Sequence, residues 1–206
     1  MARFRKNGSR IVEVDLSGES VKALAGAMIA YEGDISFKKA GFGGGEGIRG
    51  ALKRKVTGES LDLMECAGSG TVYFAHEATE IELVSLANET LQVESSSLLA
   101  LDSGLKTNVT FAGLRGATAG QGLFTTTVSG NGVVALLSDG PAISLEVAPQ
   151  YPLVVDPDAY VASKGRLNQS FVTDVSWRSA VGKGSGEAFS LRFDGSGVVL
   201  IQPAER

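Results

Sequence analysis

The sequence is poor in the side chains on which most catalytic and metal sites depend. Its 206 residues include one cysteine, Cys66, and one histidine, His76. A lone cysteine excludes a disulfide within the chain and fits a reducing compartment. One cysteine and one histidine far apart in sequence provide neither a Ser-His-Asp nor a Cys-His arrangement, and zinc usually needs three or four ligands. We therefore expect no enzyme activity, no metal and no cofactor.

Long apolar runs and an excess of positive charge are also missing. No apolar stretch approaches the roughly 18 residues of a membrane-spanning helix. The start, Met1-Ala-Arg-Phe-Arg-Lys6, is basic but no apolar segment follows it, so we expect a cytoplasmic protein without a secretory signal. The formal net charge of −4 argues against a general polyanion binder, because nucleic-acid affinity depends on neutralising phosphates. Nucleic acid is not an expected partner.

Glycine, by contrast, is abundant and recurs in one short phrase. Among the 27 glycines, Gly68-Ser-Gly-Thr-Val72 is repeated as Gly130-Asn-Gly-Val-Val134 and as Gly195-Ser-Gly-Val-Val199. Each copy lies between two runs of strand-forming residues. Glycine adopts the positive φ angles of tight turns without a steric penalty. The phrase therefore predicts three β-hairpin turns.

Residues around the phrase repeat in the same order. Short strands bounded by turn clusters at intervals of roughly 8–12 residues are typical of a sandwich, jelly roll or barrel. A module of about 60 residues buries little apolar surface by itself. We therefore expect one compact all-β unit with little helix, in which three sandwich-like or jelly-roll-like modules share a core with pseudo-threefold symmetry. The offsets between the repeats divide the chain into modules at residues 1–77, 78–140 and 141–206.

The spacing differs between modules in one place, which lies just before the glycine phrase. Length variation confined to one place marks a loop. We expect the three loops to gather at one end as a locally basic rim, with a protein or an anionic membrane as the candidate partner. Ile48–Lys55, in the first loop, is the one segment for which we expect a helix. The basic residues of the three loops are Arg49, Lys53, Arg54, Lys55, Arg115, Arg178 and Lys183.

Two further patterns have catalytic or cofactor interpretations. Gly45–Gly50 has the G-x-G-x-x-G spacing of a dinucleotide site, but that site requires a preceding parallel strand and a full helix, which the surrounding sequence does not predict. Glu59 and Glu187 occupy equivalent places in two modules and suit a general acid–base pair. The second module has Gln121 there, which favours a structural hydrogen-bonding role.

Several short motifs occur in the order of a known family. Over roughly residues 10–203 the chain resembles the altered-inheritance-of-mitochondria biogenesis family. The resemblance implies a fold like that of the tryptophan RNA-binding attenuation protein, three β-rich modules, a homo-oligomer and no catalytic residues. The motifs are Gly26-Ala-Met28, Lys53–Ser60, Gly68–Ala75, Ser97–Ala100, Gly122-Leu-Phe124, Pro152–Asp156, Tyr160–Ala162, Gly186-Glu187 and Gly195–Gln202.

The expected function is that of a non-enzymatic scaffold or interaction protein, peripheral to a membrane. The alternative is a regulatory protein that binds a small ligand or RNA, by analogy with the attenuation protein. Analogy of fold is a weak guide, because function depends on particular sites. The acidic charge balance further disfavours RNA as the ligand.

Overall fold

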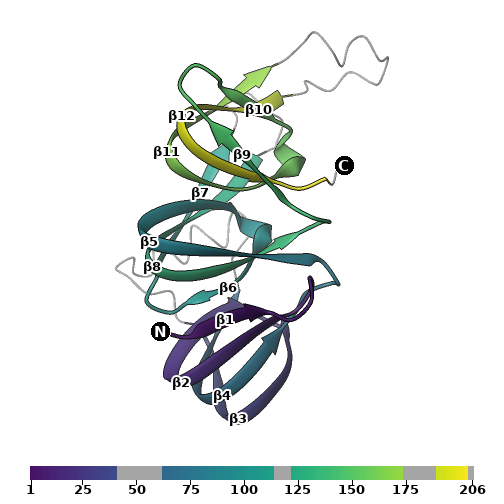
Figure 1. Cartoon of the computed structure of the whole chain (residues 1–206), viewed down its shortest axis with the longest axis vertical. Coiled ribbons are helices and arrows are strands. Elements are labelled where there is room, and N and C mark those ends of the chain that lie inside the picture. The colour runs from purple at the N-terminus through teal and green to yellow at the C-terminus, as the bar shows by residue number, and fades with distance from the viewer. Residues whose placement is uncertain (41–61, 114–121, 174–188, 204–206) are drawn as a thin grey trace. The chain divides into compact units, whose positions relative to one another are not determined.

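The computed structural model describes residues 1–40, 62–113, 122–173 and 189–203 (Figure 1). Within these ranges the regular structure is almost entirely β, which confirms the all-β part of the predicted fold class, and the two single-turn 3₁₀ helices are Ser95–Ser97 and Pro157–Ala159. The strands are β1 (Arg3–Lys6), β2 (Val12–Leu24), β3 (Met28–Lys39), β4 (Leu63–Phe74), β5 (Glu80–Glu94), β6 (Leu98–Asp102), β7 (Lys106–Gly113), β8 (Gly122–Ser138), β9 (Ile143–Val147), β10 (Leu153–Val155), β11 (Tyr160–Thr173) and β12 (Phe189–Ile201).

The chain forms two compact units, each assembled from separate segments. Unit 1 consists of Met1–Asn88, Ser95–Lys106 and Gly130–Leu137, and unit 2 consists of Glu89–Glu94, Thr107–Ser129 and Ser138–Arg206. The long strands β5 and β8 contribute residues to both units. The three-module division of the sequence stays a prediction.

The strands are joined by antiparallel hydrogen bonding. In unit 1 the order β6-β2-β4-β3 is extended by β1, which pairs with β2. In unit 2, β12 pairs with β10, β9 and β11, and β11 also pairs with the end of β5. Among the strands of the described ranges, β3 is the last in the hydrogen-bonded order and pairs with β4 alone on that path.

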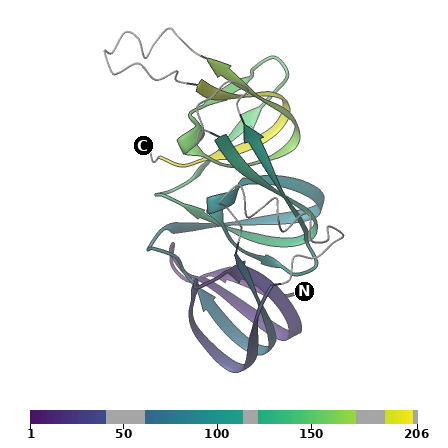
Figure 2. The same ribbon diagram turned by 180° about the vertical axis from the view of Figure 1, so that it is seen from behind.

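The repeated glycine phrase lies inside strands, so the prediction of three hairpin turns is wrong. The three copies fall in the middle of β4, β8 and β12, each of which continues on both sides. Gly68 and Gly70 have φ of 142° and 154°, a conformation that residues with a Cβ atom rarely adopt. The curved strands of unit 1 are visible from both sides in Figures 1 and 2. The glycines are therefore bends within continuous strands.

Close contact between backbones explains why these bends require glycine. A Cβ atom added at Gly68 would lie 2.0 Å from the carbonyl oxygen of Asp34, and one added at Gly70 would lie 2.0 Å from that of Glu32. The bend changes the direction of β3 and brings side chains on either side of it together. The ring centroids of Tyr31 and Phe37 are 5.2 Å apart, whereas six residues of extended strand span about 20 Å.

Each unit has an apolar core built by strand alternation. In β2, Val12 and Val14 are fully buried while Glu13 between them is not, as expected for a strand with one face in the core. In unit 2 the stacked rings of Tyr160 and Phe193, 5.5 Å apart, lie in the core. The described residues contain no helix with the length and apolar character needed to cross a membrane.

We predict that alanine is tolerated much less well at Gly68 than at Gly130. Both positions have strongly positive φ, which costs roughly 1–3 kcal/mol for a residue with a Cβ. A Cβ at Gly130 would find its nearest neighbour at 3.4 Å, compared with 2.0 Å at Gly68. Urea denaturation should give Gly68→Ala a lower midpoint than Gly130→Ala. The positive φ destabilises both variants, and only Gly68→Ala has the added clash with a backbone oxygen. Equal midpoints would contradict the close-approach argument.

Candidate interaction surface

The basic loop residues proposed from the sequence lie outside the described part of the chain. This applies to the expected helix Ile48–Lys55 and to the pair Glu59 and Glu187 with Gln121. The locally basic rim therefore stays a prediction. The site residues concerned are Arg49, Lys53, Arg54, Lys55, Arg115, Arg178 and Lys183.

The single histidine and the single cysteine both have structural roles. The backbone carbonyl of His76 accepts hydrogen bonds from the N–H of Thr79 at 2.9 Å and from its hydroxyl at 2.7 Å, which closes the turn between β4 and β5. Cys66 is fully buried in the core of unit 1. Burial raises the pKa of the Cys66 thiol to about 12. A thiol that stays protonated is a poor nucleophile.

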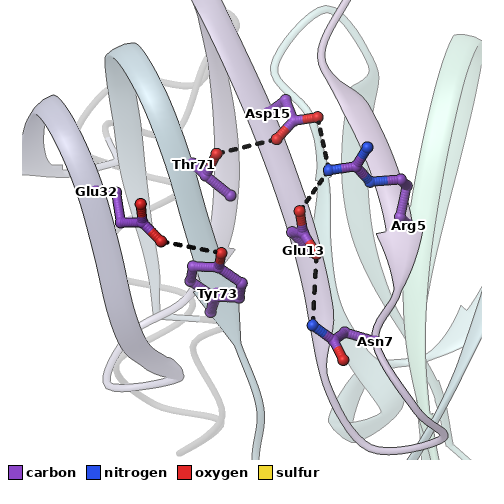
Figure 3. Close-up of polar contacts among 7 residues, drawn as sticks. All are labelled: Arg5, Asn7, Glu13, Asp15, Glu32, Thr71 and Tyr73. Atoms are coloured by element: carbon purple, nitrogen blue, oxygen red, sulfur yellow. Dashed lines mark hydrogen bonds and ion pairs between the residues drawn. The ribbon is translucent and has the colours of Figure 1, made fainter.

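The outward face of β1, β2 and β4 carries a ladder of polar side chains (Figure 3). Arg5 on β1 stands beside Glu13 and Asp15 on β2, because the strands pair Arg5 with Glu13 and the residues two apart share a face. The guanidinium donates to Glu13 and lies 3.0 Å from an Asp15 carboxylate oxygen. Asn7 also donates to Glu13, at 3.5 Å. These contacts fasten the short strand β1 to β2.

The ladder continues across β4 to β3. The hydroxyl of Thr71 donates to Asp15 at 3.0 Å, and the hydroxyl of Tyr73 donates to Glu32 at 3.2 Å (Figure 3). Partial burial is the main cause that raises the pKa of Tyr73, and the hydrogen bond to Glu32 adds to it. Tyr73 is therefore held protonated, with its proton directed at a carboxylate.

The ladder has the chemistry of a structural network. Its carboxylates each accept a hydrogen bond or an ion pair from a neighbouring strand, so each has a partner within the sheet. Among the described residues no group of three or more histidine, cysteine, aspartate or glutamate side chains is arranged to hold a metal ion. The side chains of this face keep the strands in register.

Exposed apolar side chains lie on the neighbouring strand, β3. From Ile29 to Asp34 every residue is exposed, and Ile29 and Tyr31 are 54% and 48% accessible. Tyr31 pairs with the fully buried Val72 of β4, so it lies on the core-facing side of the sheet and yet remains half exposed. We call β3, Met28–Lys39, the edge surface, because it ends the strand order and presents these residues.

The bend at Gly33 divides the edge surface into two arms of different character. The first arm, Met28–Glu32, contains the exposed apolar residues. The second arm, Asp34–Lys39, carries an acidic residue at its start and two lysines at its end, all exposed. Ile35 and Phe37 of this arm face the core of unit 1. Their faces alternate with those of Asp34, Ser36 and Lys38.

The edge surface is absent from the sequence-based site prediction. Its signals are the apolar run Met28–Tyr31 and the reversal from acidic to basic residues between Glu32 and Lys39. Neither pattern reveals that a strand is the last in its sheet, because that depends on which other strands pair with it.

Comparisons with known proteins place the chain in a family and support its fold. The profile of the family described as mitochondrial biogenesis AIM24 matches residues 3–204. An X-ray crystal structure of a protein from Streptococcus pyogenes, a structural genomics target, superposes with a TM-score of 0.75 at 22% identity, over 100% of this chain and 94% of that one. No curated protein matches the chain.

We predict that Cys66 resists thiol reagents until the protein unfolds. With a pKa of about 12, about one thiol in ten thousand is ionised at pH 8, and burial blocks access. Because the folded state raises this pKa, stability from the buried thiol is complete below the pKa of the unfolded cysteine and is lost as the pH rises from there towards 12. Labelling with a chromogenic disulfide reagent should follow the urea unfolding curve. Rapid stoichiometric labelling without urea would contradict the assignment.

Proposed function

The chain belongs to the mitochondrial biogenesis AIM24 family, and we propose that it acts as a non-enzymatic scaffold that binds protein chains through the edge surface. One observation carries the proposal, namely that β3 ends the strand order with Ile29 and Tyr31 exposed. An edge strand with exposed apolar side chains is a ready template for pairing with another chain. Aromatic side chains are also enriched where proteins bind one another.

The polar ladder supports a binding role over a catalytic one. Activated catalytic groups need a nucleophile within reach of a base, in a site that shifts its pKa towards reactivity. In the ladder the pKa of Tyr73 is raised and Arg5 is engaged by two carboxylates. Both arrangements hold the groups in their unreactive protonation states.

The proposal has two finer parts that come from the sequence. The first is a homo-oligomeric, cytoplasmic chain of three modules with pseudo-threefold symmetry. It is supported by the mid-strand position of the glycine phrase in β4, β8 and β12, and a crystal structure of the complete chain would test it. The second is a peripheral association with anionic membranes through the basic residues Lys53, Arg54 and Lys55.

We predict that a photo-crosslinker at Tyr31 captures protein partners. A benzoylphenylalanine placed at residue 31 lies on the exposed first arm, and irradiation of cells should yield protein adducts of higher mass. The matched control has the crosslinker at Ile143, the exposed first residue of β9, which is 54% accessible. Adducts at position 31 that exceed those at position 143 support the scaffold. Absence of protein adducts at position 31 would reject it.

We predict that the membrane association depends on the first basic loop. Flotation with vesicles containing about one third anionic lipid should recover the native chain, because each basic residue near such a surface contributes about 1 kcal/mol. The triple variant Lys53→Ala, Arg54→Ala and Lys55→Ala should remain at the bottom of the gradient. Neutral vesicles serve as the control. If the native chain does not float with anionic vesicles, this part of the proposal fails while the protein-binding part stands.

A further inference from the structure

We propose that the partner on the second arm of the edge surface is a second copy of the same arm. The inference deepens the proposed scaffold function by naming one partner and its register. Two copies of Asp34–Lys39 would add to each other as antiparallel strands related by a twofold axis through Ser36. Such an interface is closed, because each copy uses the same surface.

The register follows from the arrangement of charges in the arm. With Ser36 opposite the partner's Ser36, each Asp34 lies opposite the partner's Lys38, so the twofold axis produces two pairs of opposite charge. Directly opposed residues in an antiparallel pair lie about 5 Å apart and share a face, and opposite charges there are stabilising. Both residues are exposed in the single chain.

The inward face agrees with the same register. Ile35 of one copy then lies opposite Phe37 of the other, on the side that faces the core of unit 1. Phe37 is half-buried in the single chain, so the pairing places apolar atoms against a ring that its own unit leaves partly open. In this one register, the apolar residues of the arm lie opposite apolar residues and its charged residues lie opposite residues of opposite charge.

Other registers of the arm give poorer matches. Opposed residues of an antiparallel pair share a face, so the neighbouring twofold registers differ by two in the sum of the paired numbers. They place Asp34 opposite Ser36 or opposite Ala40, and both therefore lose the pairs of Asp34 with Lys38. Parallel pairing in register would place Asp34 beside Asp34 and Lys38 beside Lys38, and like charges in opposition are destabilising. The bend at Gly33 ends the flat segment, so pairing does not extend continuously into the first arm.

The test of register is a disulfide between twofold-related residues. In the proposed register Ser36→Cys places two thiols opposite each other at a separation suited to a disulfide. Mild oxidation should convert most of this variant into a covalent dimer on non-reducing gels. The control is Lys39→Cys, whose counterpart in this register is the partner's Gly33, so it should remain largely monomeric on the gel. The native Cys66 is buried and takes no part.

A charge swap tests the electrostatic part in solution. Sedimentation equilibrium of the native chain should reveal a dimer, and Asp34→Lys should raise its dissociation constant at least about tenfold, because both charge pairs become repulsive. Adding Lys38→Glu should restore most of the affinity. Lys39→Glu is the control with a charge change of equal size and opposite sign, since Lys39 contacts Asp62 of its own chain at 3.1 Å and has no charged counterpart across the axis. Circular dichroism checks that each variant is folded.

The outcomes separate this inference from the scaffold proposal. A covalent Ser36→Cys dimer, together with loss and rescue of the dimer in the charge variants, supports self-pairing. A monomeric native chain, or a dimer unaffected by Asp34→Lys and not trapped by Ser36→Cys, overturns it. Adducts at position 31 that contain other proteins would still support the scaffold in that case.

Discussion

The fold depends on backbone contacts that only glycine permits. Where the paired strands β3 and β4 bend together, the carbonyl oxygens of Glu32 and Asp34 lie 2.0 Å from the places where Gly70 and Gly68 would carry a Cβ. The same crowding recurs in unit 2, where a Cβ at Gly195 would lie 2.2 Å from the carbonyl oxygen of Arg166. Because the strands bend at these points, one continuous strand supplies side chains on both sides of a core. The two-armed edge surface follows from the same bend.

The sequence identified the repeated glycines and the β class, but it misassigned what the glycines do. Strand-like runs on both sides of Gly68–Gly70 predict either a hairpin or one bent strand, and both need positive φ. The choice depends on whether the flanking runs pair with each other or with a third strand. In the structure both runs of β4 pair with β2 and β3. Which strands pair with each other depends on residues far apart in the sequence, so the local pattern around the glycines does not determine it.

The sequence predicted the candidate site less well than it predicted the fold. The sequence-based prediction chose lysines and arginines in the glycine-rich loops, because basic clusters are unusual in a chain with net negative charge. The exposure of Tyr31 was not predicted, since an aromatic residue at the end of an apolar run such as Met28–Tyr31 is more often buried. Within the described ranges β3 pairs with β4 alone on the sheet path, and Tyr31 is half exposed there.

The bend at Gly33 also limits how far the edge of unit 1 is able to polymerise. Amyloid-like stacking requires flat strands that offer the same hydrogen-bonding edge along their whole length. β3 has twelve residues, but the change of direction at Gly33 leaves only short straight segments on either side. A long edge strand is normally an aggregation hazard. We therefore expect the bend at Gly33 to make this edge a poor template for an open-ended fibre.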